Sequence, residues 1–301
     1  MRVAVITNPH AGPTAHPTPA EIRDALAKHG VTCELCSGKG KSLSAAIEEA
    51  VRNRPDAVIA SGGDGTVSSV AAALVNTGIP LGVLATGTLN HFAKDMGLPL
   101  ELEPAAAVIA AGHVRAVDVG QVNGQTFINN ASIGIYPRIV TKRDEIRERL
   151  GRGKFVAMLM AVMSLFRRYT TVHVRINSPE VAFARNTPFL FVGNNRYEMS
   201  LNAMGKRTAL DRGELSVYFT TRTGRFGLFM LALRGLFGKL EQERDFTALN
   251  VAELHIDTPR RHVPIALDGE VRRMSPPLEF RTLPGALKVL ALTPAENGVG
   301  A

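Results

Sequence analysis

The chain has 301 residues, of which 45% are apolar and 21% charged, a composition that excludes a disordered chain. Its length favours two folded domains, and a single domain stays open at this point. The formal net charge is +8, from 35 basic and 27 acidic residues, so a polyanionic partner is favoured. Aromatic residues make up only 6% and do not alternate with basic ones as a base-stacking surface requires, so we expect no nucleic-acid partner.

Neither export nor membrane insertion is expected. The apolar run at Val3–Ile6 is too short for a signal peptide and predicts a first strand. The longest apolar stretch, Phe155–Phe166, has about twelve residues against the roughly 20 that a membrane-spanning helix needs. We therefore expect a cytoplasmic protein. Cys33 and Cys36 lie three apart in a predicted strand and point to opposite faces, so they are not expected to share a metal.

Short apolar runs alternate with helical patterns over the first 118 residues, which is typical of a parallel sheet with helices on both faces. The predicted strands are Val3–Ile6, Val31–Cys36, Ala57–Ala60 and Leu81–Ala85, and the predicted helices are Pro19–His29, Ser42–Arg52, Thr66–Asn76 and Glu103–Ala111. The functional site of such an α/β domain is expected at the carboxyl ends of the strands.

After about Val117 the pattern becomes mainly strand-like, so a second, mainly β domain is predicted. Its predicted strands are Phe127–Ala131, Thr170–Ile176, Phe189–Val192, Leu215–Thr220, Ala252–Ile256, Pro264–Leu267 and Leu287–Leu292, interrupted by helical insertions at Lys154–Arg168 and Gly224–Gly235. The expected domains are therefore residues 1–118 and 119–294, followed by a tail at residues 295–301.

A phosphate site is predicted where the strand Ala57–Ala60 runs into Ser61-Gly62-Gly63-Asp64-Gly65-Thr66 and then into a helix capped by Thr66. Glycines let the backbone approach a polyphosphate, and N–H groups at a helix N-terminus point at its oxygens. A bare anion site gains nothing from a carboxylate, so Asp64 is expected to hold Mg²⁺ or a reacting hydroxyl. The alternative is a tight turn with Asp64 as a cap.

Four short motifs, in one order over nearly the whole chain, resemble those of the diacylglycerol kinase, sphingosine kinase and bacterial YegS-type lipid kinases. They are Asn8-Pro9-x-x-Gly12, Ser61-Gly62-Gly63-Asp64-Gly65-Thr66, Gly87-Thr88-Leu89-Asn90-His91-Phe92-Ala93 and Leu267-Asp268-Gly269-Glu270. The resemblance implies an α/β nucleotide domain, a C-terminal β-sandwich domain and an active site between them. It also implies transfer of the γ-phosphoryl group of ATP to a diacylglycerol-like lipid.

By the same resemblance, ATP and its Mg²⁺ would be bound by residues of the first three motifs and by one lysine. These nucleotide-binding residues are Asn8, Gly12, Gly62, Gly63, Gly65, Thr66, Thr88, Asn90 and Lys154. A lone lysine at the start of a helix is otherwise a solvated cap, and this alternative stays open for Lys154.

The resemblance implies that Asp268 is the catalytic base and that Glu270 joins a Mg²⁺ network reaching Asp64. Phosphoryl transfer needs a group that orients or deprotonates the attacking hydroxyl and a metal that neutralises charge. Some relatives assign the base role to the aspartate of the glycine loop, and a plain Asp-Gly turn is a further alternative. Asp211 is only a fallback metal ligand, because Arg212 stands where the family often has an aspartate.

A lipid kinase without a membrane span needs an apolar surface ringed by cations. Gly151–Arg168 and Arg222–Lys239 both have basic residues around an apolar middle. The first suits a buried helix, so peripheral contact with the inner face of the membrane is expected through residues 222–239. The expected partner is a lipid substrate at the membrane surface, and a homodimer stays open.

Two other functions stay open. A soluble small-molecule kinase related to NAD kinase shares the Gly-Gly-Asp-Gly loop, but the motifs at residues 87–93 and 267–270 favour a lipid kinase. A catalytically silent nucleotide- or lipid-binding regulator would not need Asp64, Asp268 and Glu270. Tyr136-Pro137-Arg138 offers no carboxylate for an amine, so a neutral or anionic lipid acceptor is favoured.

Overall fold

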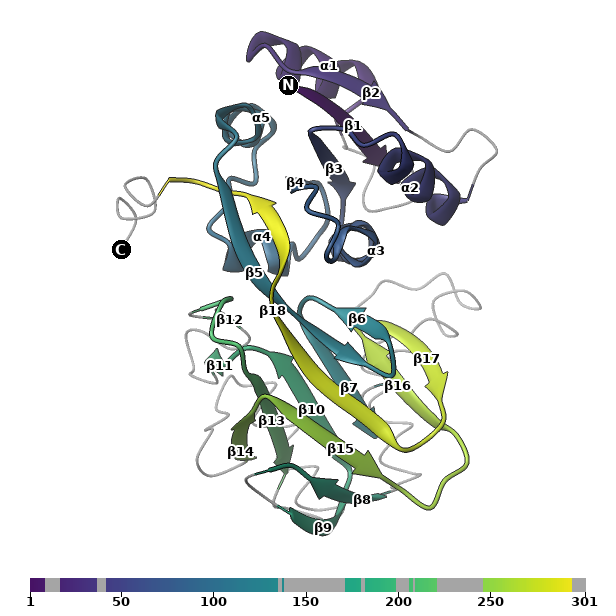
Figure 1. Ribbon diagram of the computed structural model, residues 1–301. Helices are drawn as coiled ribbons and strands as arrows, with labels where there is room; N and C mark the ends of the chain where they lie inside the picture. The colour runs from purple at the N-terminus through teal and green to yellow at the C-terminus, as the bar shows by residue number, and fades with distance from the viewer. Residues whose placement is uncertain are drawn as a thin grey trace. The chain divides into compact units, whose positions relative to one another are not determined.

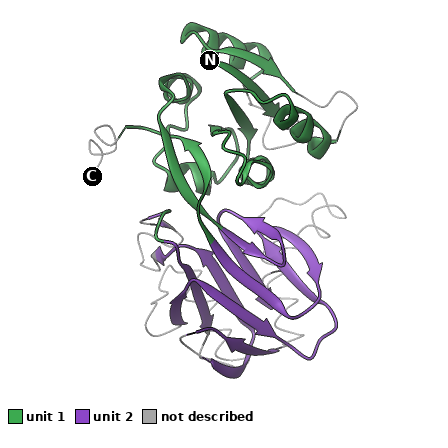
Figure 2. Cartoon of the chain, viewed as in Figure 1, with its two compact units in different colours: residues 1–119, 210–212, 283–301 green, residues 120–209, 213–282 purple. Residues whose placement is uncertain are grey.

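The computed structural model describes residues 1–8, 17–36, 42–134, 137, 171–179, 182–198, 206–207, 209–220 and 246–293. Contacts divide the chain into two compact units (Figure 2): unit 1 holds residues 1–119, 210–212 and 283–301, and unit 2 holds residues 120–209 and 213–282. The domain boundaries at residues 118 and 294 stay predictions, because compactness does not show which part folds independently. The predicted insertions at 154–168 and 224–235 and the tail lie outside the described residues.

Unit 1 has the predicted α/β architecture (Figure 1). Its elements are β1 (Arg2–Thr7), α1 (Pro19–Lys28), β2 (Thr32–Leu35), α2 (Leu43–Arg52), β3 (Ala57–Gly62), α3 (Asp64–Leu74), β4 (Leu81–Ala85), α4 (His91–Asp95), α5 (Leu102–Ala111), the first part of β5 (Val114–Val122) and the last part of β18 (Leu278–Leu290). The sheet order is β2-β1-β3-β4-β18, and each neighbouring pair is parallel. The predicted helices and strands are all present, whereas the short helix α4 was not predicted.

Both faces of this sheet are covered, which explains why its central strands are apolar without alternation. All six residues of β3 are buried. On one face, Val3, Val5 and Ile59 pack in one core with apolar residues of α1 and α5. Helices α2 and α3 contact each other and the sheet on the opposite face (Figure 1).

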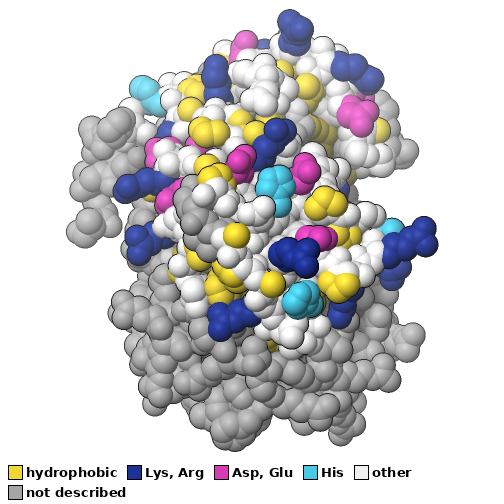
Figure 3. Space-filling model, turned by 60° about the horizontal axis from the view of Figure 1, so that its bottom comes forward, with side chains coloured by type: hydrophobic (Ala, Val, Ile, Leu, Met, Phe, Trp, Pro, Cys, Tyr) yellow, Lys and Arg dark blue, Asp and Glu magenta, His cyan; other side chains and the backbone are white. Residues whose placement is uncertain are grey.

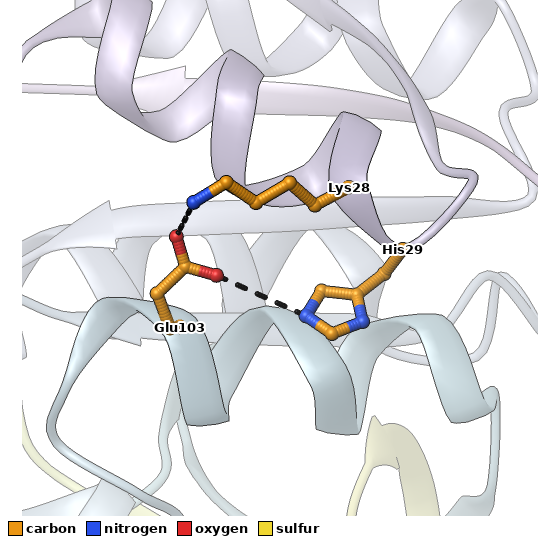
Figure 4. A network of polar contacts seen from close by, with 3 residues as sticks. All are labelled: Lys28, His29 and Glu103. Carbon is orange, nitrogen blue, oxygen red and sulfur yellow. Dashed lines mark hydrogen bonds and ion pairs between the residues drawn. The ribbon is translucent and has the colours of Figure 1, made fainter.

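A surface network joins α1 to α5 (Figure 4). Lys28 donates to Glu103, and the ring of His29 lies 3.9 Å from the second carboxylate oxygen. The hydrogen bond from Lys28 to Glu103 raises the pKa of the lysine. The side chains of Lys28 and Glu103 are 64% and 50% exposed, so we interpret the network as a helix-to-helix contact with little effect on stability.

Unit 2 is a β-sandwich. Its strands, besides the remaining parts of β5 and β18, are β6 (Gln125–Phe127), β7 (Asn130–Gly134), β8 (Val172–Asn177), β9 (Ala182–Thr187), β10 (Phe189–Asn194), β11 (Tyr197–Glu198), β12 (Lys206–Arg207), β13 (Leu215–Thr220), β14 (Phe246–Val251), β15 (Glu253–Asp257), β16 (Val263–Leu267) and β17 (Glu270–Met274). One antiparallel sheet has the order β14-β13-β10-β7-β16-β17, and the facing sheet includes β18-β15-β8-β9. Alternate apolar residues of both sheets form one core.

Two strands predicted for the mainly β domain differ from the structure. The segment predicted at Leu287–Leu292 includes the end of β18, which lies in unit 1 beside β4, and the strand predicted at Phe127–Ala131 is wrong. The run Phe127–Ala131 contains the end of β6, a bend at Ile128 and Asn129, and the start of β7. At the bend, the backbone N–H groups of Ile128 and Asn129 donate to the carboxylate of Asp268 instead of to a neighbouring strand. A long-range side-chain contact therefore interrupts a segment whose residues favour a strand.

None of the helices in the described part of the chain is long and apolar enough to cross a membrane.

Asn123 connects the β5–β6 hairpin by hydrogen bonds to the start of β18 and the segment before it. Asn123 and Gly124 form its two-residue turn, with φ angles of 46° and 80°, as a type I′ turn requires. The side chain of Asn123 donates to the carbonyls of Ser275 and Pro277 at 3.2 and 3.1 Å, and it accepts from the N–H of Glu279 at 2.7 Å. Turn formation and long-range attachment thus depend on one residue.

We expect Asn123→Ala to lower the free energy of unfolding by about 2–4 kcal/mol, because it removes these hydrogen bonds and strains a left-handed backbone. Asn123→Gly is the matched control: it also lacks the side-chain bonds but adopts the same φ without strain, so its loss should be smaller by about 1 kcal/mol. Urea denaturation measures both values. Equal losses would exclude backbone strain as a contribution.

Candidate active site

The carboxyl ends of β1 and β3 form the switch point of the unit 1 sheet. The chain moves outward from β1 to β2 and then crosses back to β3, so the connections leave this edge in opposite directions. Ligands of open α/β sheets bind in the crevice at such a point. Thr7 is paired with Ser61, so Asn8 and Gly62 directly follow neighbouring positions on the two strands. The sheet thereby brings together residues of the first two predicted motifs.

The turn after β3 differs from the prediction in one respect: Thr66 is not the helix cap. Helix α3 begins at Asp64, and its N-cap is Gly63, which has no side chain to cap the first N–H groups. Asp64 is the first helical residue, where a carboxylate is favoured by the helix dipole. Thr66 instead lies in the first turn of α3, and its N–H donates to the Gly63 carbonyl. The uncapped N-terminus suits an anion.

The loop after β4 packs directly on this turn. A Cβ atom on Gly87 would lie 2.5 Å from the Cα of Gly63 and 2.8 Å from Oδ1 of Asn90. Asn90 is buried in a left-handed conformation, with φ 52°, and its side chain accepts from the N–H of Gly87 and donates to the Gly87 carbonyl. Asn90 therefore closes the loop and leaves Thr88 exposed. Glycine is required at position 87 by backbone packing alone.

A buried hydroxyl group and a neighbouring pocket lie at the same edge of the sheet, and together they suit a ligand that has both a polar and an apolar part. The hydroxyl of Thr66 is buried and has no hydrogen-bond partner within the described residues. A pocket of about 330 Å³ lies beside the β4 loop, lined mainly by Pro17, Leu84–Gly87 and Leu100–Leu102. The phosphate-type turn and an apolar recess thus lie at the same sheet edge.

Within the part of the chain that the structure describes, no group of three or more His, Cys, Asp and Glu side chains is arranged to hold a metal ion. Asp64 and Glu270 belong to different units, so their sharing one metal ion stays a prediction. Asp211 forms an ion pair with Arg115 at 2.9 Å. Mg²⁺ commonly uses only one or two carboxylates together with substrate phosphates, so Asp64 beside the glycine turn retains a suitable ligand.

Asp268 has a well-defined position in unit 2. Asp268 and Gly269 form the two-residue turn between β16 and β17, with φ angles of 47° and 89°, because Leu267 pairs with Glu270. The Asp-Gly turn that sequence analysis left as an alternative is therefore present. The carboxylate of Asp268 also accepts from the N–H groups of Ile128, Asn129 and Asn130 at 2.9, 2.8 and 3.0 Å. Such bonds favour the ionised carboxylate.

Two of the predicted nucleotide-binding residues, Gly12 and Lys154, lie outside the described residues. Asp64 belongs to unit 1, whereas Asp268 and Glu270 belong to unit 2. The meeting of these carboxylates at one active site therefore stays a prediction.

Comparison with known proteins identifies the family. A family model for the diacylglycerol kinase catalytic domain matches residues 2–122. A probable YegS-like lipid kinase of Pseudomonas aeruginosa is 30% identical over 81% of this chain and 79% of its own length. The chain belongs to the YegS-like lipid kinases of the diacylglycerol kinase family. This membership confirms the resemblance that the four motifs indicated.

This chain spans a smaller part of two other relatives. A probable YegS-like lipid kinase of Pectobacterium atrosepticum is 35% identical over 50% of this chain and 51% of its own length. An uncharacterized protein of Synechocystis is 30% identical over 85% of this chain, which spans 59% of that relative.

Solved structures confirm the fold of this YegS-like chain. A structure titled a putative diacylglycerol kinase from Bacillus anthracis has a TM-score of 0.73 at 24% identity and covers 98% of this chain and 96% of its own. A second one from the same organism has a TM-score of 0.71 at 23% identity and covers 98% of each chain. The predicted combination of an α/β domain and a mainly β domain is thus correct.

We expect Gly87→Ala to lower the free energy of unfolding by about 2–4 kcal/mol, because the new methyl group would overlap the backbone of Gly63. Gly63→Ala is the matched control. Its methyl group would meet Gly87 at an ordinary 3.4 Å, and its loss should stay below about 1 kcal/mol. Thermal and urea unfolding of both variants checks the difference, and equal losses would contradict the tight contact on Gly87.

Proposed function

We propose that this YegS-like protein transfers the γ-phosphoryl group of ATP to a hydroxyl of a diacylglycerol-like lipid. The observation that carries this proposal is the glycine contact at the switch point, where the backbone of Gly63 meets Gly87 beside the uncapped N-terminus of α3. Backbone N–H groups and a helix dipole at a sheet edge favour a polyphosphate. The names of the relatives support a lipid as the acceptor.

The donor is proposed to be ATP with Mg²⁺. Gly62, Gly63 and Gly65 would contact the phosphates, and the buried hydroxyl of Thr66 would gain a partner there. Asn90 would hold the adjoining loop, and the pocket next to Gly87 would accommodate the nucleoside. Asn8, Gly12, Thr88 and Lys154 complete the proposed contacts. Bound Mg²⁺ would neutralise charge on the transferred group, with Asp64 and Glu270 as ligands and Asp211 as a fallback.

Asp268 is proposed to orient the lipid hydroxyl or to accept its proton. Three backbone N–H donors hold its carboxylate in one orientation and favour its ionised form. An immobilised, ionised carboxylate is well suited to fix the direction of a hydroxyl group for attack. Strong proton abstraction is less favoured by these bonds, so the orienting role is the larger part of the proposal.

Membrane contact through residues 222–239 is part of the proposal, although this segment lies outside the described residues. On the face drawn in Figure 3, the basic side chains of the described residues are interspersed with acidic ones. No continuous cationic patch is visible there among the coloured atoms. Docking at the cytoplasmic face would then depend on local basic residues, each contributing on the order of 1 kcal/mol.

The decisive experiment is phosphoryl transfer to an unselected acceptor. The protein is incubated with γ-labelled ATP, Mg²⁺ and a total lipid extract, and the organic phase is separated by chromatography. We expect label in a lipid product and loss of that product when EDTA removes Mg²⁺. Label in NAD or another water-soluble acceptor, with none in lipid, would instead establish the small-molecule kinase, and no transfer to either acceptor would favour a silent regulator.

Asp64→Asn and Asp268→Asn are expected to lower kcat by at least about 100-fold while the chain still folds, because each removes a carboxylate from the transfer step. Asp268→Asn should also loosen the bend at residues 128–130 locally, because one acceptor oxygen is replaced by an NH₂ group. Asp24→Asn is a control on the exposed face of α1 and should retain parental activity. The labelled-lipid assay measures the rates, and thermal unfolding checks folding. Parental activity in either active-site variant would contradict its assigned role.

A further inference from the structure

Arg207 is a buried cation in unit 2. It contacts the bend at Ile128 and Asn129, whose N–H groups bind the carboxylate of Asp268. Only 2% of Arg207 is exposed. One terminal nitrogen of its guanidinium donates to the carbonyls of Ile128 and Asn194 at 2.6 and 3.2 Å, and the other donates to Oδ1 of Asn129 at 2.8 Å. Its guanidinium carbon lies 5.5 Å from the centre of the Tyr197 ring. The planar group is thereby fixed in direction as well as in place.

The same peptide group joins Arg207 to Asp268. The peptide between Ile128 and Asn129 accepts from Arg207 through its carbonyl oxygen and donates to Asp268 through its N–H, which belongs to Asn129. A cation therefore binds the negative end of one peptide dipole, and a carboxylate binds its positive end. Each charge polarises the peptide in the direction that strengthens the other hydrogen bond.

Neighbouring bonds hold this bend from both sides. The side chain of Asn194 donates to the Ile128 carbonyl at 3.0 Å, and the N–H of Asn194 donates to the Asn129 carbonyl at 2.9 Å. The N–H of Asp268 donates to the Asn130 carbonyl at 2.9 Å. The bend at residues 128–130 is thus connected to β10 and β12 by its carbonyls and to the β16–β17 turn mainly by its N–H groups.

We propose that Arg207 is a positioning residue that acts through the Ile128–Asn129 peptide to hold the Asp268 carboxylate in its orientation for phosphoryl transfer. The proposal rests on the proposed function for its catalytic consequence, but the mechanical connection can be measured without activity. Arg207 does not touch the carboxylate itself in this connection. Its effect on turnover must therefore disappear when Asp268 can no longer act.

Arg207→Lys tests this connection with the positive charge retained. Lysine cannot reproduce the planar fork that bonds to two carbonyls and one amide at once. Asn129→Ala is a second variant: it removes the side-chain acceptor of Arg207, whereas the backbone N–H that donates to Asp268 is retained. Phe280→Leu is the control for general destabilisation, because Phe280 lies in the sandwich core.

The kinetic test is a double-mutant cycle. We expect Arg207→Lys to lower kcat about 10- to 100-fold through misplacement of Asp268, while the KM for ATP changes by less than about threefold. In an Asp268→Asn background, the same change should lower kcat by less than about twofold. Phe280→Leu should lower the melting temperature but leave kcat near the parental value. Additive losses, or an equal loss in Phe280→Leu, would overturn the proposal.

Hydrogen exchange provides the test that does not depend on turnover. The amides of residues 128–130 should exchange about tenfold faster in Arg207→Lys, Asn129→Ala and Asp268→Asn, because each variant weakens one side of the same bend. In Phe280→Leu these amides should change no more than the rest of unit 2. Unchanged protection in Arg207→Lys and Asn129→Ala would overturn the connection. Faster exchange without lipid phosphorylation by the parent protein would instead contradict the proposed function and retain the connection.

Discussion

The contact between Gly63 and Gly87 is the constraint on which the candidate site in unit 1 depends. Parallel strands β3 and β4 are neighbours, so the loops that follow them leave the sheet side by side. A Cβ atom on Gly87 has no room against the Gly63 backbone. Asn90 closes the second loop through two hydrogen bonds to the backbone of Gly87. The glycines are therefore needed to build the site before any ligand is considered.

In unit 2, the carboxylate of Asp268 is held at the tip of the β16–β17 hairpin. Hairpin tips are ordinarily among the more mobile parts of a sheet. Here the tip carries a side chain that binds three successive N–H groups of a distant bend, and a buried arginine binds the carbonyl side of that bend. The order of the tip therefore comes from polar contacts, which have the directional precision that apolar packing lacks.

The helices and strands of the α/β unit were predicted well because the residues that begin and end them lie close by in the sequence. Strand β4 occurs at its predicted bounds, Leu81–Ala85, between Pro80 and the loop at Thr86. The start of α3 was placed two residues late because a threonine is a common cap, whereas the cap is the glycine Gly63. The glycine turn after β3 and the Asp-Gly turn between β16 and β17 could both be recognised directly from the sequence, and the structure contains both.

Two features of unit 2 could not be predicted from the sequence because they depend on contacts between residues far apart in the chain. The bend at Ile128 and Asn129 lies inside a strand-like run, and it depends on residues about 140 positions away in the chain. Arg207 lies on a strand of two residues with no apolar periodicity, so nothing local distinguishes it from a surface cation. Burial, which makes this arginine important, is a property of the assembled sandwich.

The last part of β18 has a consequence for how the protein is made. Residues 283–290 belong to unit 1 and lie beside β4, although the strands on the other side of β4 come from the first 62 residues. While the ribosome is still producing the intervening chain, the edge of β4 must wait without its final neighbour. An open, apolar strand edge readily pairs with other chains. The sheet of unit 1 is therefore complete only when residues from both ends of the given sequence have come together.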